Sequence, residues 1–127
     1  MKWEKTRWPS FKEEEFMCKC GCLQTNMHSV TLDLLQKLRN MCGFPLVITS
    51  GYRCPTHNKS VSHTGEAGPH TTGKAVDIKV DRQKAYTVLK CALILGFTGI
   101  GVSQKGEGRF LHLDNINDTT RPTVWSY

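Results

Sequence analysis

Apolar residues recur at helical spacing in two stretches of the chain. The first stripe consists of Leu32, Leu35, Leu38 and Met41. It predicts a helix over residues 29–42, because Gly43 follows directly and glycine favours a helix end there. The second stripe consists of Ala85, Val88, Leu89, Ala92 and Leu95. It predicts a helix over residues 82–95, again followed by a glycine, Gly96.

Shorter segments with β-branched or alternating residues predict strands. They are residues 44–50, 74–80, 99–103 and 109–114. The polar residues 104–108 predict a hairpin turn, residues 54–72 a long loop, and residues 1–26 an irregular N-terminal arm. This order of elements favours one α+β domain over residues 1–127, with helices packed on one face of a small, mainly antiparallel sheet.

Composition and charge narrow the class of protein. A chain of 127 residues with 39% hydrophobic side chains suits one globular domain. The longest wholly apolar run, residues 91–95, is far shorter than the ~20 residues of a membrane span. We therefore expect no membrane insertion. No secretory signal is visible at the N-terminus, so we expect synthesis in the cytoplasm and action elsewhere only after release.

The net charge is +6, from 17 Lys and Arg against 11 Asp and Glu. Such a surplus favours loose attraction to polyanions, either nucleic acid or an anionic cell envelope. The positive charge is compatible with a small nucleic-acid-binding protein whose cysteines form a zinc knuckle. The chain has no continuous Lys/Arg stripe with interleaved aromatic residues, however, and we therefore expect no nucleic-acid partner.

The sequence is compatible with three chemical states of the six cysteines. The chain contains Cys18, Cys20, Cys22, Cys42, Cys54 and Cys91. Reduced or partly buried thiols, a disulfide pair and a second metal site are all compatible with this set. Because C-x-C-x-C differs from the C-x2-C spacing of structural zinc sites, the spacing favours the thiols.

Four side chains on or beside two predicted strands can form a metal site. His70 precedes the second strand and Asp77 lies within it, while His112 and Asp114 share one face of the last strand. Two imidazoles and a carboxylate suit zinc, and a fourth position open to water makes a site catalytic. The alternative is that these side chains are ordinary hydrogen-bonded residues, with Asp77 paired to a nearby cation.

Three sequence motifs, which occur in order along the chain, strengthen the prediction of a metal site. Residues 50–58 read SGYRCPTHN, residues 70–77 read HTTGKAVD, and residues 110–114 read FLHLD. Together they resemble the motifs of the M15 family of zinc peptidases, which includes D-Ala-D-Ala carboxypeptidases and bacteriophage endolysins that cut peptidoglycan stem peptides. The likeness runs from about Phe16 to the C-terminus.

The resemblance implies a role for each matching residue. His70, Asp77 and His112 would bind one Zn²⁺ ion, and Arg53 would contact the substrate carbonyl or carboxylate. In the carboxypeptidase branch of the family, a Glu or Asp that accepts the proton stands three residues before the last zinc histidine, where this chain has Arg109. Asp114 is the substitute that we expect, with Glu107 as an alternative. His63 and His57, both on the expected loop, are candidates for contact with the substrate or the transition state.

The function implied is zinc-dependent hydrolysis of amide bonds in peptidoglycan stem peptides, by a monomer that acts on the bacterial cell wall. The bond could be D-Ala-D-Ala, as in a carboxypeptidase, or L-Ala-D-Glu or a cross-bridge, as in an endopeptidase. The small size and basic charge suit a phage-type lysis enzyme. The alternative is a zinc-containing module of the same fold that binds the cell wall without turnover, for which Arg109 is the best argument.

Overall fold

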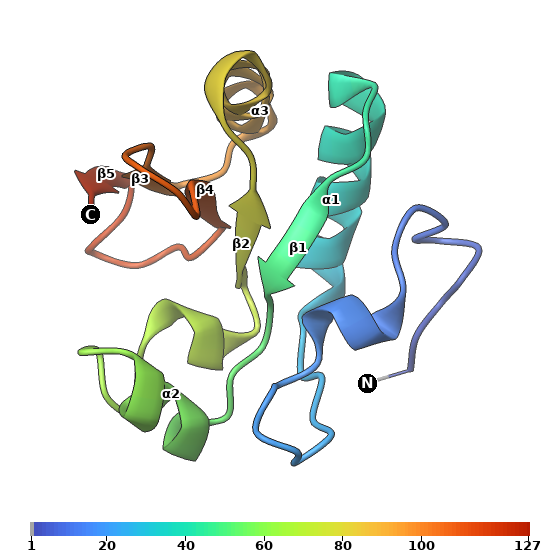
Figure 1. The fold of residues 1–127 in the computed structure, drawn as a ribbon. Coiled ribbons are helices and arrows are strands. Elements are labelled where there is room, and N and C mark those ends of the chain that lie inside the picture. The colour runs from blue at the N-terminus through green and yellow to red at the C-terminus, as the bar shows by residue number, and fades with distance from the viewer. Residues whose placement is uncertain (1) are drawn as a thin grey trace.

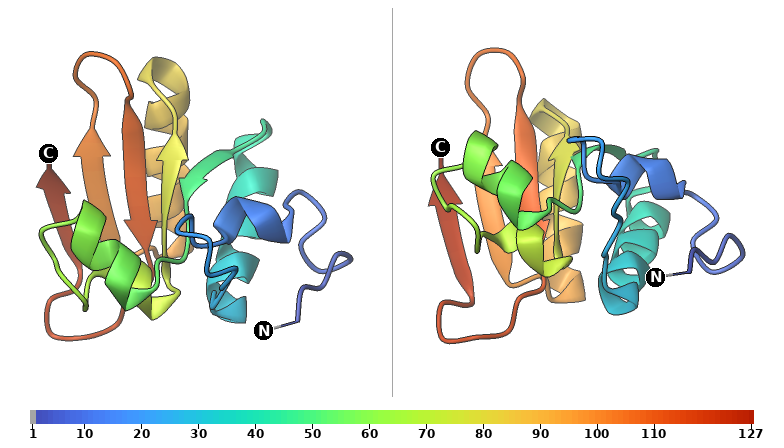
Figure 2. Two further views of the ribbon diagram at one scale, coloured as in Figure 1. Left: turned by 60° about the horizontal axis from the view of Figure 1, so that its bottom comes forward. Right: turned by 90° about the horizontal axis from the view of Figure 1, so that it is seen from below.

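The computed structural model describes residues 2–127, and its centre is a five-stranded sheet (Figure 1). The strands are β1 (Val47–Ser50), β2 (Ala75–Lys79), β3 (Gly99–Ser103), β4 (Phe110–Asp114) and β5 (Thr123–Ser126). They lie in the order β1-β2-β4-β3-β5, which Figure 2 shows from two further sides. All neighbouring strands are antiparallel except β3 and β5, which pair in parallel.

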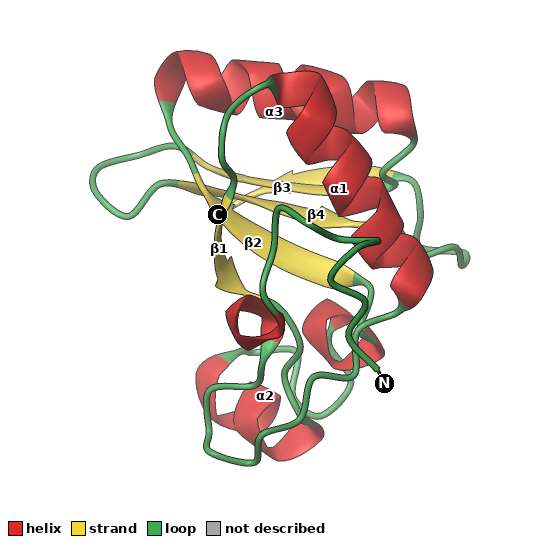
Figure 3. Cartoon of the chain, turned by 90° about the vertical axis from the view of Figure 1, so that its right-hand side faces the viewer, coloured by secondary structure: helices red, strands yellow, loops and turns green. Residues whose placement is uncertain are grey.

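Helices lie on both sides of this sheet (Figure 3). The long helices α1 (Ser29–Cys42) and α3 (Arg82–Leu95) cover one face, while the short helix α2 (Pro55–Val61) lies on the other side. Two 3-10 turns complete the structure, η1 (Glu13–Phe16) and η2 (Pro69–Thr72). The α+β class with a mainly antiparallel sheet is confirmed.

Alternation along the two central strands separates the core from the site. Val76 and Ile78 on β2, and Leu111 and Leu113 on β4, are buried in one hydrophobic cluster with residues of α1 and α3. Successive side chains of a strand point to opposite faces, so Asp77 on β2 projects away from this core. His112 and Asp114 on β4 do the same. The sheet thus uses one face for stability and the other for polar side chains.

The N-terminal arm packs firmly on this body. Trp8, Phe11 and Phe16 are buried in the same hydrophobic cluster as the sheet and the long helices. Arg7 donates two hydrogen bonds to the Asp33 carboxylate on α1, at 2.8 and 2.7 Å, and the Trp8 indole donates a third at 2.8 Å. These contacts attach the arm to the outside of α1.

Two parts of the chain differ from the sequence expectation. The segment 54–72 is not a plain loop, because it contains α2 and η2. Strand β5 was not expected, since Val124 is exposed and the strand offers no apolar stripe. Within residues 2–127, none of the helices combines the length and the apolar character needed to cross a bilayer.

Candidate active site

The register of β2 and β4 places Asp77 directly opposite His112. Directly opposed residues of an antiparallel pair present their side chains on the same face. The Asp77 Oδ1 atom lies 3.3 Å from His112 Nδ1 and the two side chains are largely buried. Backbone pairing alone therefore brings two of the expected ligands together.

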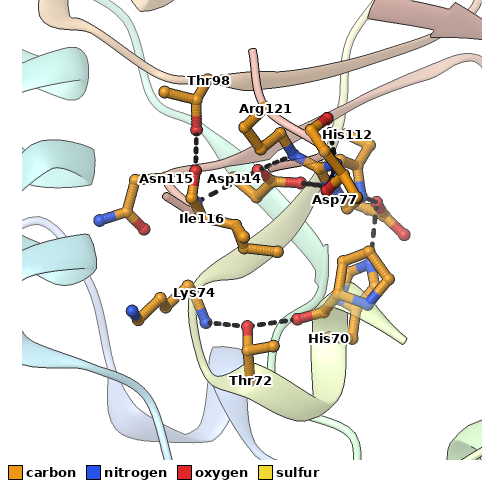
Figure 4. Close-up of polar contacts among 12 residues, drawn as sticks. His70, Thr72, Lys74, Asp77, Thr98, His112, Asp114, Asn115, Ile116 and Arg121 are labelled. Atoms are coloured by element: carbon orange, nitrogen blue, oxygen red, sulfur yellow. Dashed lines mark hydrogen bonds and ion pairs between the residues drawn. The ribbon is translucent and has the colours of Figure 1, made fainter. Parts of the chain in front are cut away.

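His70 reaches the same carboxylate from η2, the turn that precedes β2. Its Nε2 atom lies 3.3 Å from Asp77 Oδ1, and its ring centroid lies 5.1 Å from that of His112. Figure 4 shows His70 and His112 on either side of Asp77. The three expected zinc ligands thus form one cluster, with their ligand atoms all within 4.8 Å of one another.

Hydrogen bonds on the far side of each imidazole determine which nitrogen is available. His70 Nδ1 lies 2.8 Å from the Gly51 carbonyl oxygen, which can only accept, so the neutral ring carries its proton there and leaves Nε2 free. His112 Nε2 lies 2.7 Å from Asp114 Oδ2, which leaves Nδ1 free in the same way. Both free nitrogens face Asp77.

The three residues fit a divalent metal ion. Asp77 Oδ1 is buried and accepts no hydrogen bond, which is costly for a carboxylate oxygen unless a cation is bound there. Burial works against ionisation of Asp77, but its polar contacts with His112 and His70 outweigh burial and lower the pKa below its usual value. An ionised carboxylate and two imidazole lone pairs are the donor set that zinc prefers.

Asp114 holds His112 from behind. The carboxylate is completely buried, and Arg121 donates to both of its oxygens at 2.9 and 2.8 Å (Figure 4). Burial opposes its ionisation, but hydrogen bonds with His112 and Arg121 prevail and lower the pKa of Asp114 to about 2. Burial also opposes protonation of His112, yet its hydrogen bond to Asp114 and its close contact with the Asp77 carboxylate raise its pKa in the metal-free protein.

Two glycines of β3 make room for this pair. Gly99 pairs with Asp114, and Gly101 pairs with His112. A Cβ atom at Gly99 would lie 2.2 Å from Asp114 Oδ1, and one at Gly101 would lie 2.7 Å from Trp125 Nε1. Side chains at these positions would displace the Asp114 carboxylate and the Trp125 ring, so the site requires glycine on the neighbouring strand.

Neighbouring polar groups orient the Arg53 side chain toward the cluster of His70, Asp77 and His112. It donates from Nε to Ser50 Oγ at 3.1 Å and from Nη1 to Asn58 Oδ1 at 3.2 Å, and its Nη2 lies 3.5 Å from Asp77 Oδ2. Asn58 is itself buried and donates to Thr64 Oγ1 and to the Gly65 carbonyl. Asn58 therefore organises the segment around Arg53.

A pocket of about 670 Å³ opens over these groups. Its lining includes the three clustered residues and Arg53, together with the exposed side chain of His63. Trp125 and Tyr127, on and after β5, form part of its wall, and the Trp125 ring centroid lies 4.9 Å from that of His112. Sequence reasoning missed these two aromatic residues and Arg121, because it did not anticipate that the chain returns to the sheet after β4.

The expected proton acceptors lie elsewhere. Both oxygens of Asp114 are engaged, and the residue does not line the pocket. Glu107 is exposed on the β3–β4 hairpin and lines a different pocket, as does Arg109. His57 is half-buried on α2 and is not part of the pocket wall. Proton transfer by Asp114 stays a prediction, and its geometry favours an orienting role.

Comparison with known proteins identifies the family. The family model Peptidase M15 matches residues 9–114, a stretch that contains Arg53 and all three clustered residues. The match ends before β5, so Arg121, Trp125 and Tyr127 lie outside it. No curated protein sequence matches the chain. Since the family model covers most of the chain, this protein belongs to the Peptidase M15 family of zinc-dependent metallopeptidases.

Proposed function

We propose that the protein is a peptidase that hydrolyses amide bonds in the stem peptides of peptidoglycan. The observation that carries this proposal is the cluster of His70, Asp77 and His112 at a pocket that also contains Arg53. A site with three protein ligands and one open side is the arrangement of catalytic rather than structural zinc. Zinc held by these residues would polarise the substrate carbonyl and lower the pKa of a water molecule toward neutrality.

The surrounding residues each have a physical task in this reaction. Arg53 is positioned to stabilise the negative charge that develops on the carbonyl oxygen, or to bind a substrate carboxylate. Asp114 accepts from His112 Nε2 and so keeps Nδ1 directed at the cluster. Arg121 neutralises Asp114 and holds both of its oxygens in place.

The pocket suits an acidic peptide. Stem peptides carry free carboxylates, and Arg53 is a cation on the pocket wall. Trp125 and Tyr127 add aromatic surface against which an extended peptide can lie, and His63 provides a further polar contact. The net charge of +6 favours loose adsorption to an anionic cell wall.

The test is release of peptides from purified peptidoglycan by the intact protein, with product masses determined. The masses distinguish carboxypeptidase action, which releases one terminal residue, from endopeptidase action. His70→Ala is expected to abolish release, whereas His28→Ala, a change at an exposed residue before α1, should leave it intact. Undiminished release by His70→Ala, or after complete zinc removal, would overturn the proposal.

A second function has one observation in its favour. Arg109 stands where a proton acceptor is expected in the carboxypeptidase branch of the family. Among the described residues of the pocket wall, Asp77 is the only one with a carboxylate side chain. A cell-wall binding module without turnover would show this pattern. Co-sedimentation with peptidoglycan, in the absence of any released peptide, would support binding alone.

A further inference from the structure

Four cysteines from two distant segments converge on one point of the molecule. Cys18, Cys20 and Cys22 come from the turn that follows η1, and Cys54 comes from the segment between β1 and α2. Their four sulfur atoms all lie within 4.8 Å of one another. Cys20 Sγ lies 3.6 Å from Cys18 Sγ and 3.6 Å from Cys54 Sγ.

These separations match metal coordination. A disulfide bond joins two sulfur atoms at about 2.05 Å, so the 3.6 Å pairs are not bonded to each other. In a regular tetrahedron with zinc–sulfur distances of about 2.3 Å, neighbouring sulfurs are about 3.8 Å apart. A single metal ion therefore explains why the sulfurs gather at this spacing.

The turn that carries three of the cysteines is shaped to present them together. In an extended strand, alternate residues lie about 6.6 Å apart, too far for three sulfurs to share one ion. Here the backbone turns at Gly21, whose φ of 94° favours glycine, and the Cys18 amide donates to the Gln24 carbonyl at 2.8 Å to close the turn. Alternate cysteines consequently face one centre.

Backbone amides also point at the sulfurs. The Cys54 amide donates to Cys18 Sγ at 3.3 Å, and the His57 amide, in the first turn of α2, donates to Cys54 Sγ at 3.4 Å. Such N–H donors favour the thiolate form, which is the form that binds metals. The cluster is partly shielded from solvent, since Cys18 and Cys54 are buried, Cys22 is half-buried and Cys20 is exposed.

We propose that Cys18, Cys20, Cys22 and Cys54 bind a second zinc ion, separate from the His/Asp cluster. Four sulfur donors fill a tetrahedral sphere and leave no position for water, so this site is structural rather than catalytic. Binding releases the thiol protons to solvent, and each sulfur donates a lone pair to the ion. The sequence spacing argued against such a site because C-x-C-x-C differs from C-x2-C. The fourth ligand, Cys54, lies 32 residues beyond Cys22.

This ion would connect the N-terminal arm to the segment that builds the pocket. Cys54 directly follows Arg53, and the Tyr52 amide donates to the Phe16 carbonyl at 2.9 Å. The same segment includes Gly51, whose carbonyl orients His70. A metal at the cysteines would therefore hold Arg53 and the Gly51 carbonyl in position without touching the substrate.

Metal stoichiometry of the intact protein, measured by elemental analysis without chelators, tests the proposal. We expect two zinc ions per chain in the wild type and one in the variant His70→Ala/His112→Ala. We also expect one in Cys20→Ser/Cys22→Ser and two in the matched control Cys42→Ser, a cysteine outside the cluster. If the histidine variant retains no zinc, the four-cysteine site does not exist, whatever the enzymatic activity.

Two measurements remain informative if a cysteine variant does not fold. Cobalt bound to the histidine variant should show the intense near-ultraviolet charge-transfer bands of thiolate ligands, and their absence would overturn the proposal. In the wild type, alkylation followed by mass spectrometry should modify the four clustered cysteines only after metal removal. Equal modification before chelation, or a mass lower by two hydrogens for each disulfide, would also overturn it.

Discussion

Residues 51–54 take part in two clusters of potential metal ligands, since the Gly51 carbonyl contacts His70 and Cys54 is one of the four clustered cysteines. The two clusters are built differently. The His/Asp cluster takes its three ligands from β2, β4 and the turn η2, and it opens into the pocket. The cysteine cluster takes four sulfurs from two irregular segments. Three ligands beside a pocket leave room for a substrate, whereas four ligands complete a sphere and serve the fold.

The contrast extends to what holds each cluster together. Asp77 and His112 are aligned by the backbone ladder of β2 and β4, which persists without any ion. The cysteine turn has one closing backbone hydrogen bond, from Cys18 to Gln24. Removal of metal should therefore impair turnover at the first cluster and loosen the N-terminal arm at the second.

The largest effect that would sharpen this contrast is expected at Arg53, on the boundary between the clusters. Arg53→Ala should lower kcat/KM for peptide release by about 10²–10³-fold, because it removes a charged donor from the developing oxyanion. Zinc content should not change, since Arg53 is not a ligand. Arg53→Lys should recover only part of the loss, because lysine lacks the planar fork that contacts Ser50, Asn58 and Asp77 together.

Arg109→Ala is the matched control for this prediction. Arg109 is also an arginine beside a central strand, but it contacts the Gly106 carbonyl on the hairpin and does not line the pocket. Kinetics on purified peptidoglycan fragments should show little change for it. An equal loss in both variants would mean that general positive charge, rather than the position of Arg53, supports the reaction.

A smaller effect is expected behind His112. Asp114→Asn weakens the contact that orients the ring and leaves Arg121 without its carboxylate partner, so zinc affinity at the His/Asp cluster should fall about 10–100-fold. Competition with a chromophoric chelator measures this change. Asp118→Asn, an exposed carboxylate bonded to Thr120, is the control. Unchanged zinc affinity in Asp114→Asn would remove the orienting role.

The smallest effect is expected on acid stability after metal removal. The folded-state pKa of Asp114 is lowered to about 2, so the group stabilises the fold above its unfolded pKa of about 3.9. This contribution, on the order of 2 kcal/mol, is lost as the pH falls from about 4 toward 2. Urea midpoints at several pH values should fall more steeply for the wild type than for Asp114→Asn, and parallel curves would contradict the prediction.

The sequence predicted the elements that carry a clear apolar period. Leu32, Leu35 and Leu38 identified α1, because this helix buries these side chains in the hydrophobic cluster. Met41, the last residue of the predicted stripe, is exposed. Helix α2 has no such stripe, and its one buried side chain is the polar Asn58. Strand β5 could not be predicted from the sequence either. It is an exposed edge strand held by backbone pairing with β3, and such pairing imposes no apolar pattern on the side chains.

The same distinction applies to the sites. His70, Asp77 and His112 stand in an order and spacing that pointed to one cluster, and the sheet brings them together. Arg121 could not be foreseen, because its contact with Asp114 depends on how residues 115–122 return to the sheet. The four-cysteine cluster could not be predicted, because it depends on the fold, which brings Cys54 beside the N-terminal turn.

The paired glycines of β3 have a practical consequence for surveys of related chains. Gly99 lies opposite Asp114 and Gly101 lies opposite His112, where a side chain would clash. The space that the site needs can therefore be recognised in a sequence from these two glycines. A chain with G-x-G on the strand before H-x-D has room for a carboxylate behind its metal-binding histidine. A bulky residue at the first of these positions identifies a chain that must support the histidine by other means, and such chains are the natural place to look for altered chemistry.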